Sequence, residues 1–205
     1  MTRALSPAPA ALLFLVLLAD AANAQETRVE ITPFVGYRTG GGVTDSATGA
    51  KYSLGASASW GAVADVSFGG PGRWVELLWT RQETTVPNAD AFGPSQSSLT
   101  LDTFLVGGRW ETAPNSTLSP FLAGLVGLTR LDAAGSGTSR FTASLSGGVK
   151  VMPLPNFGLR LEARALAIFA TGGSSAFCGM SGCTVGFTGW GELQGEFSAG
   201  LVVAF

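Results

Sequence analysis

Histidine is absent from the 205 residues of the sequence. Without an imidazole side chain there is no Ser–His nucleophile pair, no His-based metal site and no His general base. The carboxylates fall into no recognisable catalytic arrangement. No glycine-rich loop follows a strand and opens a helix, as a phosphate-binding loop would. We therefore expect no enzymatic activity and no cofactor or metal site.

Charged residues are also scarce, at 13% of the chain against about 25% in an average soluble protein. The 12 basic and 14 acidic residues nearly balance and form no basic stripe, so we expect no nucleic-acid partner. The segments between the periodic runs described below are polar and nearly uncharged, which disfavours binding to polyanions.

Long apolar runs are missing except at the N-terminus. A basic start at Arg3 precedes an apolar run over 10–19, and Ala22-Asn23-Ala24 follows. This order is typical of a secretory signal peptide, cleaved after Ala24. The run is shorter than the ~20 residues that a membrane-spanning helix needs. We expect a signal peptide over 1–24 and one exported domain over 25–205.

Alternation of apolar and polar residues is the dominant pattern of the exported part, and it predicts strands. In 159–169, for example, Leu159 and Leu161 alternate with Arg160 and Glu162. Only 120–130 is apolar at both parities. Most segments exceed the ~5–6 residues of a soluble strand and match the ~9–11 of a tilted membrane strand. The eight segments are 28–38, 56–68, 74–82, 100–110, 120–130, 141–151, 159–169 and 196–205.

The connections between these segments are alternately long and short, as in outer-membrane barrels. With the runs RVEITPFVGY, PFLAGLVGLTRL, TASLSGGVKV, LRLEARA and EFSAGLVVAF, the chain resembles the small OmpA/OmpX-type outer-membrane barrels. The resemblance implies an all-β, eight-stranded antiparallel up-and-down transmembrane barrel in the outer membrane. It also implies a monomer whose partners are lipid and the assembly machinery, with Phe205 read as the insertion signal. The alternative is a soluble β-sandwich in which the terminal strand is an ordinary core strand.

Aromatic residues gather near the predicted strand ends, as in the two girdles of membrane barrels. The alternative is that aromatics simply favour strands. Pro33 predicts a bulge or a local break, because it cannot donate to the ladder. The predicted periplasmic girdle comprises Phe68, Trp74, Trp110, Phe121, Phe157 and Phe205, and the outer girdle Tyr37, Trp79, Phe141, Phe169 and Trp190.

The two cysteines, Cys178 and Cys183, lie close together in the last outer connection. Export places them in an oxidising compartment, where nearby cysteines usually pair. We expect a disulfide that fixes the loop tip. The alternatives are a thiol metal site or a redox switch.

Parity places ten charged residues on the inward side of the predicted barrel, five acidic and five basic. An eight-stranded barrel is only wide enough for side chains to fill, so we expect these residues to pair and plug the lumen. We expect Arg38 and Arg160 at the rims. The expected core network comprises Glu76, Arg109, Lys150, Glu162, Arg164 and Glu196, and the other inward residues are Glu30 and Asp65.

Three functions are compatible with these observations. The first is a non-enzymatic barrel with a structural or surface-interaction role, whose extracellular loops contact a partner that the sequence does not identify. The second is a channel or transporter for small solutes. The third is a soluble periplasmic barrel that binds a ligand. The charge plug favours the first.

Overall fold

The structure is a computed structural model, and it describes nine stretches of the chain. The predicted signal peptide, 1–24, lies outside them. Within the described stretches, no helix is long and apolar enough to cross a membrane. The described residues are 28–45, 51–53, 55–85, 98–114, 116–133, 136–169, 175–179, 182–186 and 192–205.

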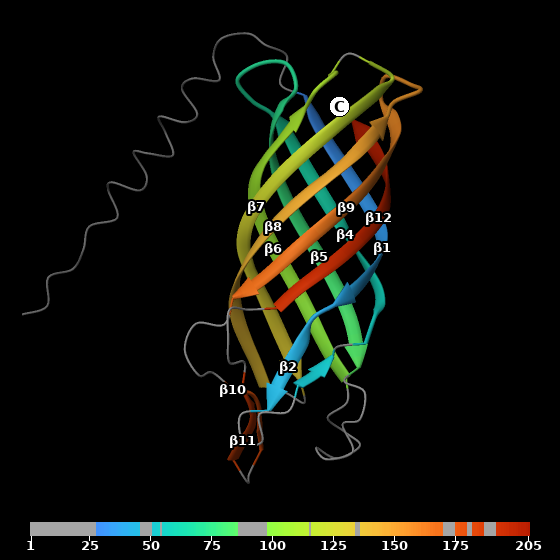
Figure 1. The fold of residues 1–205 in the computed structure, drawn as a ribbon. Helices are drawn as coiled ribbons and strands as arrows, with labels where there is room; N and C mark the ends of the chain where they lie inside the picture. The colour runs from blue at the N-terminus through green and yellow to red at the C-terminus, as the bar shows by residue number, and fades with distance from the viewer. Residues whose placement is uncertain are drawn as a thin grey trace, which may run out of the picture.

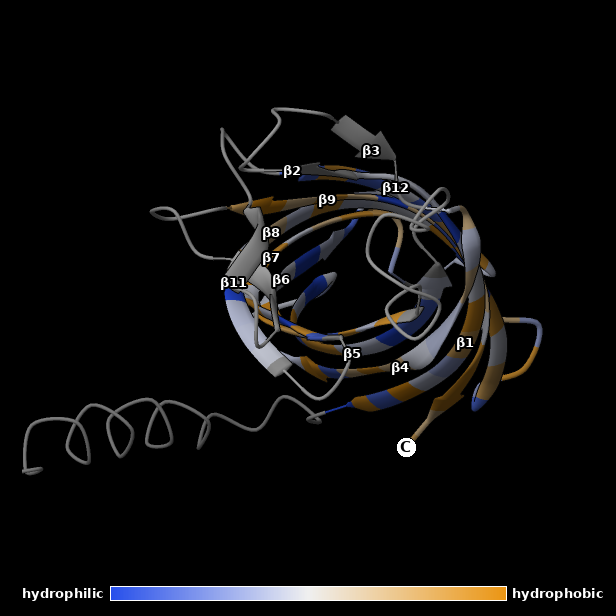
Figure 2. Ribbon diagram, turned by 90° about the horizontal axis from the view of Figure 1, so that it is seen from below, coloured by the Kyte–Doolittle hydropathy of each residue, from blue (hydrophilic) through white to orange (hydrophobic). Residues whose placement is uncertain are grey.

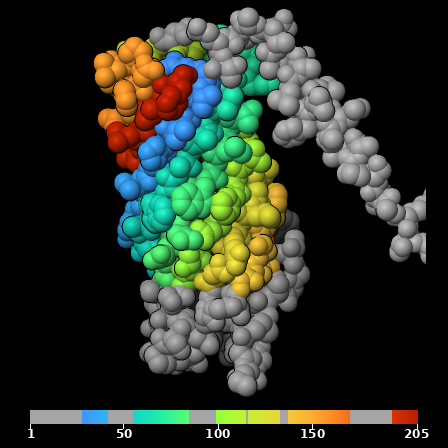
Figure 3. Space-filling view, turned by 180° about the vertical axis from the view of Figure 1, so that it is seen from behind, coloured from blue at the N-terminus to red at the C-terminus, as the bar shows by residue number. Residues whose placement is uncertain are grey.

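Eight long strands form a closed antiparallel barrel in the order β1-β12-β9-β8-β7-β6-β5-β4, and β4 pairs with β1 to complete the ring (Figure 1). In Figure 3, strands that follow each other in the sequence lie side by side in the wall. The fold predicted from the alternation is therefore confirmed. The strands are β1 (Val29–Gly40), β4 (Ser57–Ser67), β5 (Arg73–Thr85), β6 (Ser98–Glu111), β7 (Leu118–Ala133), β8 (Ser136–Val151), β9 (Phe157–Phe169) and β12 (Glu192–Ala204).

The register shows how far the strands are staggered. A row of paired residues that starts at Glu30 on β1 and runs through β4 to β9 ends at Gln194 on β12. Across the closing seam, however, Glu30 pairs with Ala204, ten residues further along β12. This stagger tilts the strands, as Figure 1 shows. A barrel of this size has an interior that side chains can fill.

Several strands extend further at the loop end than the sequence indicates. The strands β7 and β8 run through Ala133 and from Ser136, so only 134–135 separate them. Likewise β5 continues to Thr85 and β6 begins at Ser98. Their register is continuous up to these ends, so two hairpins continue the barrel wall beyond the predicted segments.

Pro33 interrupts one ladder without shifting it. On the β4 side it pairs in register with Ala62. On the β12 side the pairing passes from Ile31–Val203 to Phe34–Gly200, and the two intervening rungs are missing. The expected defect is thus a local break and not a bulge, because a missing N–H removes a hydrogen bond but adds no residue.

Four short strands form a second sheet in the order β10-β11-β2-β3. In Figure 1, β2, β10 and β11 lie at the end of the barrel opposite to the C-terminus. The sequence analysis missed this sheet because its strands are only three to five residues long. They are β2 (Gly42–Asp45), β3 (Lys51–Ser53), β10 (Ser175–Gly179) and β11 (Gly182–Gly186).

Candidate functional site

The outer face of the barrel is apolar. Hydrophilic and hydrophobic residues alternate along its ribbons (Figure 2), and large apolar side chains point outward on every strand. Val35, Leu145, Leu193 and Phe197 are each about two-thirds exposed. A belt of this kind is unusual on the surface of a water-soluble protein and is typical of a surface solvated by lipid.

An aromatic-rich rung marks the outer border of the belt. It runs across five strands, and Trp79 within it also makes an edge-to-face contact with Trp60, with ring centroids 5.0 Å apart. On β5, β6 and β7, the next rung toward the β5–β6 and β7–β8 loops is charged, with Arg81, Asp102 and Arg130 in register. The change from aromatic to charged side chains places the boundary between lipid and water here. The aromatic-rich rung comprises Trp79, Phe104, Leu128, Phe141 and Phe169.

Asp102 and Arg81 form a bidentate pair in the charged rung. The guanidinium Nε and Nη2 donate to Asp102 Oδ1 and Oδ2 at 2.8 and 2.7 Å. These hydrogen bonds lower the pKa of Asp102 and raise the pKa of Arg81 from their ordinary values. Asp102 is largely covered whereas Arg81 remains partly exposed, so the pair holds a guanidinium group at the water-facing border of the belt.

The periplasmic girdle differs from the prediction in two residues. Trp74 and Phe121 face the lumen, with 8% and 3% of their surface exposed. The guanidinium of Arg109 lies over Trp74, 4.7 Å from the ring centroid, and that of Arg160 lies 4.4 Å from the centroid of Phe121. They are cation–π partners of buried charges. Phe68, Trp110, Phe157 and Phe205 point outward as expected, whereas Trp190 lies outside the described residues.

Eleven buried charged side chains lie inside the barrel and fill much of its lumen. Each of them is at most 6% exposed. They come from every barrel strand except β7 and join into one connected set of ion pairs, which we call the lumen network. Its acidic members are Glu30, Asp65, Glu76, Glu111, Glu162 and Glu196, and its basic members are Arg38, Arg109, Lys150, Arg160 and Arg164.

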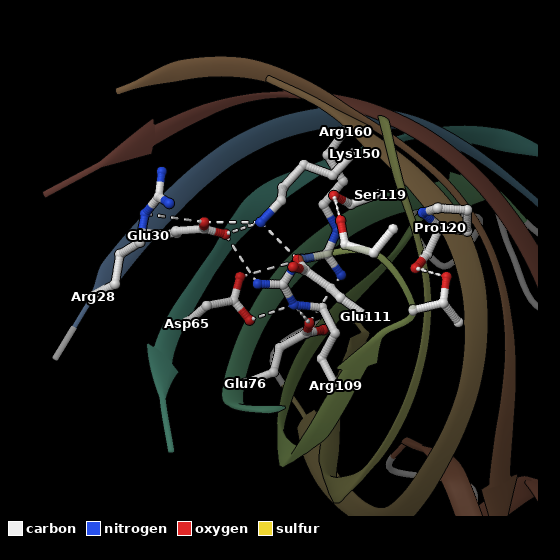
Figure 4. Close-up of polar contacts among 12 residues, drawn as sticks. Arg28, Glu30, Asp65, Glu76, Arg109, Glu111, Ser119, Pro120, Lys150 and Arg160 are labelled. Carbon is white, nitrogen blue, oxygen red and sulfur yellow. Dashed lines mark hydrogen bonds and ion pairs between the residues drawn. The ribbon is translucent and has the colours of Figure 1, made fainter. Parts of the chain in front are cut away.

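Lys150 and Arg109 organise one end of the lumen network (Figure 4). Lys150 Nζ lies 2.8 Å from Glu30 and 2.6 Å from Glu111. Arg109 contacts the same two carboxylates and adds Asp65, at 3.2 Å. Two cations thus share two carboxylates, an arrangement that leaves each buried charge with more than one opposite neighbour.

Arg160 connects this end to the rest of the lumen network. Its guanidinium lies 3.3 Å from Asp65, 2.9 Å from Glu76 and 2.8 Å from Glu162. Glu162 then pairs with Arg164 at 2.6 Å. Arg160, Glu162 and Arg164 alternate on β9 and all point inward, so one strand supplies three consecutive members.

Glu196 completes the series on β12. It lies 2.9 Å from Arg164 and 2.6 Å from Arg38. Charge therefore alternates in sign along the whole connected set, from Glu30 at one end of β1 to Arg38 near the other. Because buried charges without partners are costly, this alternation is what makes such an interior tolerable.

The structure brings together all six residues of the expected core network. It differs from the expectation at two others, since Arg38 and Arg160 are buried in the lumen network at 0% and 3% exposure and do not lie at a rim. The sequence analysis also missed Glu111, which ends β6 and lies one residue beyond the predicted segment 100–110. Extending the alternation by one more residue would have identified it.

Apolar, hydroxyl and amide side chains, together with Arg140 and Glu192, occupy the remaining lumen. The hydroxyl oxygens of Thr129 and Thr103 lie 2.9 Å apart, and those of Thr129 and Thr142 lie 2.7 Å apart. Six apolar residues form an internal cluster, which explains why 120–130 is apolar at both parities: Leu125 points inward, whereas Leu122 and Val126 point outward. The cluster comprises Phe34, Val63, Leu78, Leu105, Leu125 and Leu166.

The two other predicted sites lie at opposite ends of the molecule. Cys178 and Cys183 are paired residues of the β10–β11 hairpin. Phe205 is 70% exposed, and its backbone N–H donates to Val29 at 2.9 Å. Among the described residues, no group of three or more histidine, cysteine or carboxylate side chains could hold a metal ion.

The fold places the chain among transmembrane β-barrels. It is similar to the crystal structure of Neisserial surface protein A, with a TM-score of 0.58 and 19% identity over 86% of this chain and 97% of that one. It is also similar to the outer membrane protein AlkL, solved by solid-state NMR in lipid bilayers, with a TM-score of 0.54 and 15% identity over 88% and 90%.

The sequence itself matches no protein-family model and is not significantly similar to any curated protein. The structural likeness therefore concerns the fold, which is that of the small eight-stranded outer-membrane barrels, as the sequence predicts. Together with the apolar belt, it supports the predicted location in the outer membrane.

Proposed function

We propose that the protein is a closed, non-enzymatic outer-membrane barrel with a structural or surface-interaction role. It performs this role through its outer end, the end that carries the β5–β6 and β7–β8 hairpins and the small sheet. The observation that carries the proposal is the lumen network. Eleven buried, mutually paired charges occupy the space through which a solute would have to pass. An interior of this width, filled by side chains, leaves no open aqueous path.

The energetics of the lumen network also favour a closed barrel. An ion that crossed it would have to separate buried pairs such as Arg38–Glu196 or Arg164–Glu162. A buried charge whose partner is removed destabilises a protein by about 3–5 kcal/mol, so separating several such pairs would be costly. A small-solute channel, the second candidate, needs a lumen that opens at least transiently.

The outer end supports the second half of the proposal. The β5–β6 and β7–β8 hairpins continue beyond the lipid boundary, and the small sheet of β2, β3, β10 and β11 lies at the same end. Function in rigid scaffolds is often carried by such segments. One structural neighbour is named a surface protein, which is compatible with this role.

Conductance in planar bilayers tests the closed state. We expect no steady conductance from the wild-type protein. The double variant Glu162→Ser/Arg164→Ser removes one acid and one base, while Arg160 keeps Glu76 and Glu196 keeps Arg38. We expect it to fold and to conduct measurably, which shows that the assay detects an opened lumen. A large, steady wild-type conductance would refute the closed barrel and support a channel.

Binding of whole cells tests the surface role. Cells that display the barrel should bind a host or envelope partner more strongly than cells lacking it, and replacing the β10–β11 hairpin by a short turn should abolish the difference. If binding is unchanged without the hairpin, the outer sheet is not the contact surface.

A further inference from the structure

A hollow interrupts the apolar belt over the neighbouring strands β8, β9 and β12. These strands face the viewer in Figure 1. Its volume is about 370 Å³. Its floor consists of four small outward residues on neighbouring strands. They occupy two adjacent rungs, with Gly195 opposite Ala165 and Ala163 opposite Gly147. Elsewhere the belt carries mostly leucine, valine and aromatic side chains.

Large side chains form the walls of the hollow. Leu145 continues the first rung, and Phe197 and Leu122 end the second. All three are more than half exposed. The inward residues Ser146, Arg164 and Glu196 alternate with the floor residues and also border the hollow, which runs obliquely across the strands.

We infer that this hollow holds one acyl chain of a membrane phospholipid. A concave apolar surface in the hydrocarbon layer of a membrane contacts acyl chains. At ~30 Å³ per water-sized group, the hollow has room for roughly a dozen chain atoms. Because lipid-facing association depends on van der Waals packing and small residues allow close approach, a chain in the hollow makes more contacts than one on the convex belt.

A second copy of the protein fits the hollow less well than a lipid chain. Two-fold dimers place the same patch of each copy against itself, so two hollows would face each other and leave a void. A flexible chain has no such restriction. We therefore assign the hollow to lipid and treat dimerisation as an outcome of the test.

The charge distribution favours a zwitterionic phospholipid over lipopolysaccharide. The described outward side chains of β8, β9 and β12 include no charged group. The outward arginines of the outer rim, Arg81 and Arg130, lie on β5 and β7. Multiply phosphorylated headgroups are held by such cations, and none of these three described strand faces supplies one beside the hollow.

The test measures lipid that remains bound after purification. The protein is reconstituted with phosphatidylethanolamine, transferred to detergent micelles and examined by native mass spectrometry. The variants Ala163→Leu and Gly195→Leu fill the hollow from its floor. A Cβ atom at Gly195 would meet only Thr39 Cγ2, at 4.0 Å, so the backbone accepts a side chain there. Ala64→Leu is the matched control, since Ala64 is a small outward residue on β4 between Ile31 and Leu77.

We expect one retained phosphatidylethanolamine per barrel in the wild type and in Ala64→Leu. Retention should fall roughly tenfold in Ala163→Leu and Gly195→Leu, which corresponds to about 1.4 kcal/mol of lost packing. Equal retention in all four proteins would overturn the proposal, and so would a wild type that retains no lipid. A dimer cross-linked through Gly195→Cys, or selective retention of lipopolysaccharide in a parallel reconstitution, would assign the hollow to a different occupant and overturn it as well.

Discussion

Arg38 and Glu196 lie directly opposite each other across the seam where β1 meets β12, and their Nη2 and Oε2 atoms are 2.6 Å apart. Both side chains are fully buried. Glu196 also accepts a hydrogen bond from the Ser59 hydroxyl, at 2.8 Å, and one from Arg164, at 2.9 Å. One carboxylate thus connects β12 with β1, β4 and β9, on both sides of the seam.

Removing the charge of Glu196 should therefore destabilise the barrel. Glu196→Gln leaves Arg38 buried without an opposite charge, and we expect the free energy of unfolding to fall by about 3–5 kcal/mol. Urea unfolding in detergent micelles, followed by tryptophan fluorescence, measures the change. The same substitution at the exposed rim residue, Glu83→Gln, should have little effect. Equal effects at both positions would contradict a stabilising role for the buried pair.

We predict that the Phe205 ring acts in assembly and not in stability. Phe205→Ser keeps the backbone hydrogen bonds to Val29 and should lower the outer-membrane yield, while refolding in detergent should proceed as in the wild type. Phe197→Ser is the control, because Phe197 is an equally exposed aromatic on β12, the strand that Phe205 directly follows. A loss of yield that is as large for Phe197→Ser would show a general effect of outward aromatics.

We predict that Cys178 and Cys183 form a disulfide. Directly opposite residues of an antiparallel pair have Cα atoms ~4.5–5.5 Å apart, within the ~4.4–6.8 Å range of disulfides. Maleimide labelling of the native, unreduced protein should detect no thiol, and labelling after reduction should detect two. The double variant Cys178→Ser/Cys183→Ser should unfold at the same urea concentration as the wild type, because β10 and β11 lie outside the barrel. Two labelled thiols before reduction would end this idea.

The Arg81–Asp102 pair should give a small pH dependence below neutrality. The hydrogen bonds from Arg81 lower the pKa of Asp102 in the folded protein, so the pair contributes fully above the unfolded pKa of about 3.9. The contribution is lost as the pH falls through the folded pKa. An NMR titration of the Asp102 carboxyl group should show a midpoint below 3.9 in the wild type and a higher one in Arg81→Met. An unshifted midpoint in the wild type would refute the pairing.

The barrel could be predicted from the sequence because the membrane imposes a strict contrast between outward and inward residues. Between Arg160 and Arg164, for example, every outward residue is apolar and every inward one charged. Beyond the lipid boundary this contrast disappears, and the outer parts of β5 to β8 could not be recognised. The alternation of 74–82 indicates that Trp74 points inward, but its position near a strand end suggested a girdle residue. Phe121 lies in 120–130, where both parities are apolar and the pattern gives no orientation.

The roles of individual charges were harder to predict than their orientation. Arg38 lies near the outer end of β1 and Arg160 near the start of β9, so both resemble rim residues when strands are considered separately. The depth of a residue in the lumen depends on the stagger between strands, and alternation within one strand carries no information about stagger. Only the closed barrel shows that Arg38 meets Glu196 across the seam and that Arg160 meets Asp65 and Glu76 across the lumen.

The distribution of the lumen network over seven strands has a consequence for the order of events during biogenesis. A partly formed sheet that entered the bilayer would present charges such as Asp65 and Lys150 without their partners, which lie on strands that are not their neighbours in the wall. Such exposure in hydrocarbon is costly, so half-inserted forms are disfavoured at every stage. We therefore expect closure of the ring and entry into the membrane to be concerted, because pairs across the β1–β12 seam such as Arg38–Glu196 exist only in the closed ring.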